Sequence, residues 1–185
     1  MRVLGIDPGS HKTGWGVIQS EGGRHKVLTY GVICTKADTT ATRLCDIANG
    51  IDEVVHTNKP EAIAIETIFH AKNAKSALIL GQSRGVALLC AARAGVAIFE
   101  YTAGQIKQAV TGHGRAEKEQ VQKMVQFILG INRPMVLDTS DALAAAICHA
   151  QMRVTEQSTF LAELAASRRI SKQRLKRYSN HMDDI

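Results

Sequence analysis

Two apolar segments of the sequence end on a carboxylate, which makes both acids candidates for binding a cation. Residues 2–7, RVLGID, finish on Asp7, and residues 61–66, EAIAIE, finish on Glu66. Ligands bind at the carboxyl ends of strands in open α/β sheets, so parallel neighbouring strands would bring both acids to one sheet edge. Local structure offers another interpretation of Asp7, because Asp-Pro-Gly-Ser at 7–10 is typical of a β-turn in which Gly9 accepts a positive φ.

Two later acids have the spacing of a shared helix face. Asp138 and Asp141 stand three residues apart in LDTSDALAAAICHA, residues 137–150. At a helix start this spacing places both carboxylates on one side. The same spacing fits capping, with Asp138 as the N-cap and Asp141 three residues later, because the helix dipole favours acids at both positions. Each acid taken alone is therefore explained by local structure.

The four carboxylates taken together indicate cation chemistry. Four acids near an apolar sheet end cannot all stay ionised unless a cation neutralises them. A ligand set made only of oxygen atoms suits Mg²⁺ or Mn²⁺. Two such ions about 3.5–4 Å apart can hold the attacking and leaving oxygens of an in-line displacement. The set is therefore a candidate for metal-assisted phosphodiester hydrolysis.

Hydrophobic periodicity predicts the elements that must position these acids. Strands are expected over residues 2–7, 13–19, 26–35, 61–66 and 96–101, and helices over 40–58, 73–94, 102–110, 116–129 and 139–152. The first three strands have short polar links and predict an antiparallel meander, whereas the later strands alternate with helices and predict parallel pairing. The predicted fold class is α/β, a mixed five-stranded sheet flanked by helices.

The composition indicates two properties: the positive charge favours a polyanionic partner, and the cysteine pattern favours a reducing compartment. The chain has 185 residues, a formal net charge of +6 and a pI near 9.3, which is consistent with nucleic-acid binding. The four cysteines form no C-x-x-C pair and are expected to be small buried hydrophobes. These are Cys34, Cys45, Cys90 and Cys148. We see no signal peptide and no membrane span of about 18 apolar residues, and we expect a soluble cytoplasmic protein.

The last part of the chain differs in character from the rest. The segment RRISKQRLKR at 168–177 holds six basic residues and no acid. We therefore divide the chain into a catalytic domain at 1–153 and a basic C-terminal tail at 154–185 that is flexible or partly helical. The tail adds electrostatic affinity for DNA or is a solvated segment with no role, and composition does not separate these alternatives.

Four stretches of the sequence resemble a known family. They read LGIDPGS…TGWGVI, AIETIFHAKNAKSALILGQSRGVAL, FEYTAGQIKQAVTGHGRAEKEQVQ and DTSDALAAAICHA. The chain resembles the RuvC family of bacterial Holliday junction resolvases, which has an RNase H-like fold. The resemblance covers most of residues 1–150 and does not include the tail. The opening IDPGS is shared by several RNase H-like families, whereas the middle two stretches are specific.

The resemblance implies a function and a catalytic centre. Asp7, Glu66, Asp138 and Asp141 would form the metal-binding tetrad, with Asp7 bridging two Mg²⁺ ions per active site and Mn²⁺ able to substitute. The protein would be a homodimer that resolves four-way DNA junctions in recombination and repair. Paired symmetric nicks would leave 5′-phosphate and 3′-hydroxyl ends. The branch-migration proteins RuvA and RuvB would be its partners.

Further residues of the matched stretches are candidates for DNA binding. Lys107 and Lys118 match the family's two functional lysines and would contact phosphates, although a solvated helix face is the ordinary place for a lysine. Phe69 would stack on an unpaired base at the junction centre, or else cap the core. The expected start of the helix at 73–94 would bind phosphate through nearby polar and basic side chains. These are Lys72, Asn73 and Lys75.

The helix expected at 73–94 carries small residues at steps of four, Ala77, Gly81 and Gly85. Such a smooth stripe allows another helix to approach closely, from the same chain or from a second subunit, and we favour the dimer. Three other functions remain open on the residues alone. They are an actin-like ATP-binding protein, an RNase H-like nuclease that acts on RNA, and a module that binds junctions without cutting. An actin-like protein would need two duplicated halves. A module that binds without cutting would be supported by the loss of a catalytic acid, but all four acids are present.

Overall fold

The structure is a computed structural model that describes residues 1–36, 39–67 and 74–155. The chain divides into two compact units, residues 1–151 and 152–185. Only the first few residues of the second unit are described, so the account below concerns the first unit. The predicted limits of the catalytic domain and of the basic tail, 1–153 and 154–185, stay a prediction.

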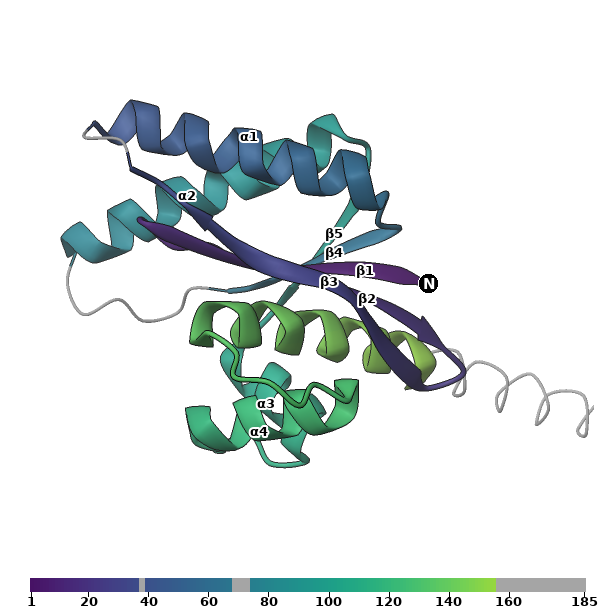
Figure 1. The fold of residues 1–185 in the computed structure, drawn as a ribbon. Coiled ribbons are helices and arrows are strands. Elements are labelled where there is room, and N and C mark those ends of the chain that lie inside the picture. The colour runs from purple at the N-terminus through teal and green to yellow at the C-terminus, as the bar shows by residue number, and fades with distance from the viewer. Residues whose placement is uncertain (37–38, 68–73, 156–185) are drawn as a thin grey trace, which may run out of the picture. The chain divides into compact units, whose positions relative to one another are not determined.

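The first unit is built on one mixed sheet of five strands (Figure 1). They are β1 (Arg2–Asp7), β2 (Lys12–Glu21), β3 (Arg24–Cys34), β4 (Ala62–Glu66) and β5 (Ala97–Tyr101). Their order across the sheet is β3-β2-β1-β4-β5. The pairs β1–β2 and β2–β3 are antiparallel, whereas β4 runs parallel to both β1 and β5. The predicted fold class and the antiparallel start of the sheet are confirmed.

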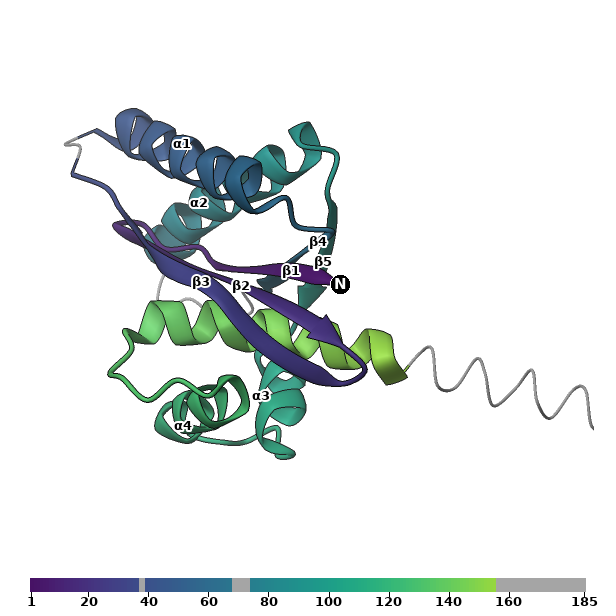
Figure 2. The ribbon, with the colours of Figure 1, turned by 45° about the vertical axis from the view of Figure 1, so that its right-hand side comes forward.

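Helices cover both faces of this sheet (Figures 1 and 2). The helices α1 (Thr40–Asn58) and α2 (Ala74–Arg93) lie on one face. On the other side lie α3 (Ala103–Thr111), α4 (Lys118–Leu129) and a last helix over residues 137–155. Every predicted element is present, and the ends that do not border undescribed residues shift by no more than two residues.

The face toward α1 and α2 is held by aliphatic side chains. Alternate residues of β1 and β4 point to this face, as the two-residue period of a strand requires. Leu4 and Ile6 of β1 and Ile63 and Ile65 of β4 are all at most 1% exposed there. They pack in one cluster with branched residues of α1 and small residues of α2. These are Ile47, Ile51, Val54, Val55, Ala87, Cys90 and Ala91.

On the face toward the last helix, glycines of β1 and β2 allow the helix to pack very closely on the strands. A Cβ added to Gly5 would lie 1.8 Å from the carbonyl oxygen of Ala142, and one added to Gly14 would lie 2.0 Å from that of Asp138. A Cβ on Gly16 would lie 2.4 Å from Leu143. Real Cβ atoms do not come this close, so the helix backbone lies directly on Gly5 and Gly14, and the Leu143 side chain lies on Gly16. This contact fixes where the helix begins relative to the end of β1.

The start of the last helix differs from the sequence-based expectation. The backbone N–H of Ser140 donates to the carbonyl of Val136 at 3.1 Å, so the helix begins at 137 and not at 139. Asp138 therefore lies inside the first turn, and the prediction that it is the N-cap is wrong. Residues 134–136 are not helical, and the helix follows them directly.

Two other expectations about local structure are corrected. Gly9 is not among the positive-φ residues of the described chain, so left-handed geometry does not explain it. A Cβ there would lie 2.1 Å from the carbonyl oxygen of Lys12, and this close approach is what requires glycine. Cys90 and Cys148 are buried as expected, but Cys34 and Cys45 are exposed, because one ends a strand and the other lies on the outer side of α1. Within the described residues, no helix is both long and apolar enough to cross a membrane.

Candidate active site

The carboxylates of Asp7 and Glu66 are mounted on adjacent buried strands. The parallel register of β1 and β4 pairs Ile6 with Ile65, and the next residue of each strand is the acid. On its other side, Asp7 pairs with Gly14 of β2. Strands buried on both faces hold functional groups more rigidly than loops do. The predicted juxtaposition of the two acids at one sheet edge is therefore confirmed.

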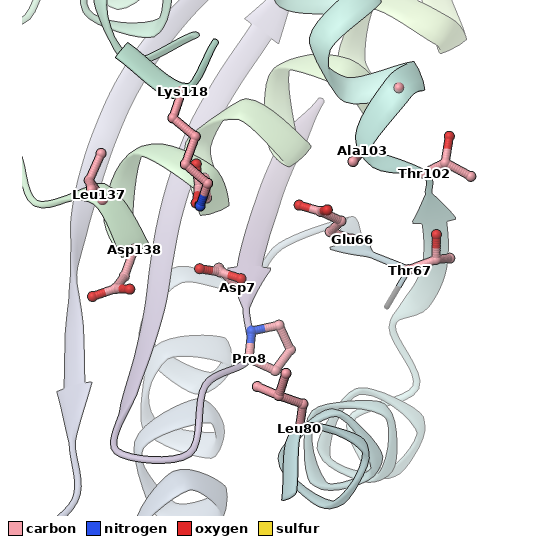
Figure 3. Close-up of a pocket in the computed structure, with 12 residues that line it drawn as sticks. Asp7, Pro8, Glu66, Thr67, Leu80, Thr102, Ala103, Lys118, Leu137 and Asp138 are labelled. Carbon is pink, nitrogen blue, oxygen red and sulfur yellow. The ribbon is translucent and has the colours of Figure 1, made fainter. Parts of the chain in front are cut away.

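All four predicted carboxylates line one open pocket of about 700 Å³ (Figure 3). Asp7 and Glu66 enter it from the sheet, and Asp138 and Asp141 enter it from the first turns of the last helix. The contact between Gly14 and the backbone of Asp138 places that helix start beside Asp7. The Lys118 side chain reaches into the same pocket from the start of α4. Residues up to 134 positions apart thus meet at one end of the sheet.

Burial and mutual repulsion oppose the ionisation of Asp7. Burial is the larger cause and the charges of Asp141, Glu66 and Asp138 follow, and together they raise the pKa of Asp7 to about 7. The positive charge of Lys118 offsets this only in part. A carboxyl group perturbed in this way, in a cleft with other acids, is typical of a functional site.

Two of the other acids are also harder to ionise than usual. Burial and then the charge of Asp141 raise the pKa of Glu66, and burial raises the pKa of Asp141. The Lys118 ammonium donates to Asp141 Oδ2 at 3.3 Å and works in the opposite direction on Asp141. In return, the charge of Asp141 raises the pKa of Lys118. The positive charge of Lys118 therefore offsets part of the repulsion among the acids of the pocket.

The pocket fits a divalent cation by its chemistry. The side chains of the pocket that could bind a metal through a charged group are all carboxylates, and hard oxygen donors suit Mg²⁺ or Mn²⁺. The burial and repulsion that raise the pKa values of these acids are effects that a bound cation offsets. Among the described residues, no three side chains of His, Cys, Asp or Glu already stand close enough to hold an ion. The acids therefore share a pocket but have to draw together around a cation.

The residues predicted to bind DNA fall into three groups. Lys107 and Lys118 both line a smaller cavity of about 170 Å³ that also includes Glu66 and Asp141, so both lysines flank the acids. Lys75 is exposed on the first turn of α2 and lines neither of these two cavities. The remaining candidates lie outside the described residues. They are Phe69, Lys72 and Asn73.

Some supporting residues escaped the sequence interpretation. The Thr67 N–H and hydroxyl both donate to the Tyr101 carbonyl, at 2.8 and 3.2 Å, and fix the chain next to Glu66. The Tyr101 hydroxyl lies 2.7 Å from His149 Nδ1 of the last helix, and His149 is fully buried. This pair links the end of β5 to the helix that carries Asp138 and Asp141. No local sequence pattern predicts the Tyr101–His149 pair, because the two residues are 48 positions apart in the chain.

Comparison with known proteins assigns the family. The family model of the crossover junction endodeoxyribonuclease RuvC matches residues 3–149. The RuvC protein of Syntrophomonas wolfei is 51% identical over 151 residues, which are 80% of this chain and 88% of the relative. The chain therefore belongs to the RuvC family of crossover junction endodeoxyribonucleases.

Solved structures agree with this assignment. The T. thermophilus RuvC in complex with a Holliday junction substrate superposes with a TM-score of 0.77 at 37% identity, covering 81% of this chain and 93% of that one. The yeast mitochondrial Holliday junction resolvase superposes with a TM-score of 0.61 at 14% identity, covering 88% of this chain and 83% of that one. At this lower identity the second likeness concerns the fold alone.

Proposed function

We propose that this protein resolves four-way DNA junctions by metal-dependent hydrolysis of phosphodiester bonds. The observation that carries the proposal is the pocket in which Asp7 and Glu66 of the sheet meet Asp138 and Asp141 of the last helix. Membership of the RuvC family supports a DNA junction as substrate, and the T. thermophilus relative was solved with such a substrate. The expected products are paired symmetric nicks with 5′-phosphate and 3′-hydroxyl ends.

The four carboxylates would hold the cation, and we assign two Mg²⁺ ions to the site, with Mn²⁺ as a substitute. When bound, the ions supply Lewis-acid stabilisation of the attacking and leaving oxygens. Asp7 would be the ligand shared by the ions, since it stands between Glu66 on one side and Asp138 on the other (Figure 3). Its strand mount keeps the carboxylate in place while the substrate strand binds.

The two lysines at the pocket would act on the DNA backbone. The Lys118 ammonium donates to Asp141, and with a cation held by that carboxylate it would be available to a phosphate oxygen at the cleaved bond. Lys107 flanks Glu66 from α3 and adds a second positive charge. We retain Phe69 as a stacking residue for an unpaired base, and Lys72, Asn73 and Lys75 as phosphate contacts next to it.

Paired cuts at a symmetric junction require two active sites, and we propose that α2 forms the contact of a homodimer. Gly81 and Gly85 are exposed, with nothing within 4 Å of an added Cβ. Leu78 and Leu89 stand 65% and 57% exposed on the same helix. Because the glycines face open space in one chain, Gly81→Leu would leave the monomer folded and lower the dimer mass in ultracentrifugation. RuvA and RuvB are the proposed partners of the assembled dimer.

Cleavage of a synthetic mobile four-way junction in Mg²⁺ tests the proposed function. Products are resolved on a denaturing gel beside those of Asp7→Asn, with a linear duplex and an RNA hybrid as alternative substrates. We expect symmetric nicks in the junction alone, and none from the variant. Cleavage of RNA would move the protein to another RNase H-like activity, and binding without cleavage by the wild type would make it a recognition module.

A further inference from the structure

The sheet end that carries Asp7 also carries basic side chains outside the carboxylate pocket. His11 directly precedes β2, and Lys12 is its first residue. Lys36 follows the end of β3, and Arg43 lies in the first turns of α1. We call these four residues the basic edge. None of them lines either cavity that contains the carboxylates.

Hydrogen bonds join the segments of the basic edge. The Thr35 N–H donates to the His11 carbonyl at 3.0 Å, which ties the end of β3 to the β1–β2 loop. Arg43 Nη1 lies 3.5 Å from His11 Nε2, which links α1 to the same loop. In addition, Lys12 pairs with Cys34 in the β2–β3 register. The basic side chains therefore stand on a connected framework.

The strand register directs Lys12 toward the carboxylate side of the sheet. Gly14 pairs with Asp7, and the Cβ direction of Gly14 points at Asp138. Side chains two residues apart share a face, so Lys12 leaves the sheet on this same face. At about 3.3 Å per residue, Lys12 lies about 7 Å further out along β2 than Gly14. Lys12 therefore lies beyond the acids at the sheet end, on the face that carries them.

Acidic partners do not account for these charges. His11, Lys12 and Lys36 are exposed, and in the described part of the chain no ion pair involves any of the basic edge. The first turn of α1 contains no acid, and the helix dipole opposes a cation such as Arg43 near that end. Clustered basic side chains without acidic partners are typical of surfaces that contact a polyanion.

The basic edge and Lys118 stand on different sides of Asp7. Figure 3 shows Lys118 on one side of Asp7 and Pro8 on the other. Pro8 leads directly into the β1–β2 loop, which carries His11 and ends at Lys12 of β2. A DNA strand that crosses the acids therefore meets Lys118 on one side and the basic edge on the other.

We propose that the basic edge binds backbone phosphates of the junction strand where it leaves the carboxylate pocket past the β1–β2 loop. This inference rests on the proposed function and adds a second contact surface to it. Phosphate contacts fix the register of a protein on DNA without reading its sequence. Held by Lys107 and Lys118 on one side and by Lys12 and Arg43 on the other, the strand lies with one phosphate centred over the acids.

Salt dependence of junction binding tests this assignment. A fluorescent four-way junction is titrated by anisotropy at several salt concentrations with the full chain carrying Asp7→Asn, so that the DNA stays intact. Lys12→Gln and Arg43→Gln are added singly and together. Each lost phosphate contact makes the slope of log K against log salt shallower by about 0.9, so we expect about 1.8 for the pair. We also expect about a tenfold weaker affinity at moderate salt.

Lys26→Gln is the matched control, because Lys26 lies on the same hairpin but pairs with Gln19 at the far end of β2. Its slope should equal that of the parent protein, and thermal melting should show all variants folded. An unchanged slope for the Lys12 and Arg43 variants, or an equal change for Lys26→Gln, overturns the proposal. If the parent protein does not prefer the junction to a linear duplex, the proposed function itself fails, and the basic edge loses its assigned ligand with it.

Discussion

The two faces of the sheet are packed by opposite means. Toward α1 and α2, branched side chains such as Ile63 fill the space between sheet and helices. Toward the last helix, Gly5 and Gly14 bring the strands directly against the helix backbone, and Gly16 leaves room for the Leu143 side chain. A side-chain layer tolerates small adjustments, whereas a backbone contact sets one distance. The second face is the one that places Asp138 and Asp141 beside Asp7.

The largest stability effect is expected on the side-chain face. Ile63→Ala removes a fully buried side chain, and such truncations cost about 2–5 kcal/mol. The melting temperature should fall by roughly 6–15 °C for a chain of this size. Mg²⁺ affinity of the folded fraction, measured by calorimetric titration at low temperature, should stay within about twofold of wild type, because the carboxylates do not touch this face.

Gly14→Ala should show the opposite pattern on the backbone face. The new methyl group would push against the Asp138 carbonyl, and overpacking of this kind costs about 1–3 kcal/mol. Because the shift moves the helix start, we expect Mg²⁺ affinity to fall by about tenfold, the equivalent of about 1.4 kcal/mol. Ile63→Ala is the control that loses at least as much stability without this loss. Equal Mg²⁺ affinities in the two variants would remove the distinction between the faces.

The pH dependence of stability should report the acidic pocket. The pKa of Asp7 in the folded protein is about 7, above its ordinary value of 3.8. The folded state therefore binds more protons than the unfolded state between about pH 4 and pH 7, and the free energy of unfolding falls as pH rises through this window. The raised pKa values of Glu66 and Asp141 add to the decline with the same sign.

Denaturant unfolding of metal-free protein between pH 4 and pH 8 measures this decline. Asp7→Asn should flatten the curve and raise the stability at pH 8 by about 1 kcal/mol, since it removes one buried charge from a repulsive group. Saturating Mg²⁺ should remove the decline in the wild type and stabilise the variant less. A wild-type curve that rises from pH 4 to pH 8 without metal would contradict the account of the pocket.

The smallest effect is expected at Lys118. Its side chain is 66% exposed, so the pair with Asp141 contributes only about 0.2–1 kcal/mol. Lys118→Gln should lower the stability of metal-free protein by that amount and leave Mg²⁺-saturated protein unchanged. Mg²⁺ should bind about threefold more tightly, because a competing positive charge is gone. Lys123→Gln, at an exposed position further along α4, should change neither quantity.

The parts of the structure that local pattern determines were predictable from the sequence. The apolar run of β1 and the period near 3.6 in α1 indicated those elements, and an acid at the end of β1 and of β4 gave half of the site. Asp138 and Asp141 taken alone were explained as well by capping, so the other half followed from the sum of four acids and from the resemblance to the RuvC family. The start of the last helix at 137 could not be predicted, since the glycine contacts that position it come from β1 and β2.

Long-range partnerships were beyond the sequence for the same reason. The Tyr101–His149 pair joins two elements that are adjacent only in the folded chain. Gly9 was explained by a positive φ because the turn pattern was read locally, but its requirement comes from the backbone of Lys12 across the loop. The exposure of Cys34 and Cys45 depends on which side of each element faces the core, which cysteine identity alone does not give.

Calorimetric titration of Mg²⁺ into Asp7→Asn, Glu66→Gln, Asp138→Asn and Asp141→Asn tests whether the four acids form one cation site. If the sheet end and the start of the last helix bring four acids together as one cation site, each variant should lose at least about tenfold in Mg²⁺ affinity. Without metal, Asp7→Asn and Glu66→Gln should also keep the wild-type melting temperature or exceed it, because burial opposes the ionisation of both acids and these variants remove the charge. A variant that binds Mg²⁺ as tightly as the wild type would show that its carboxylate is not part of the site.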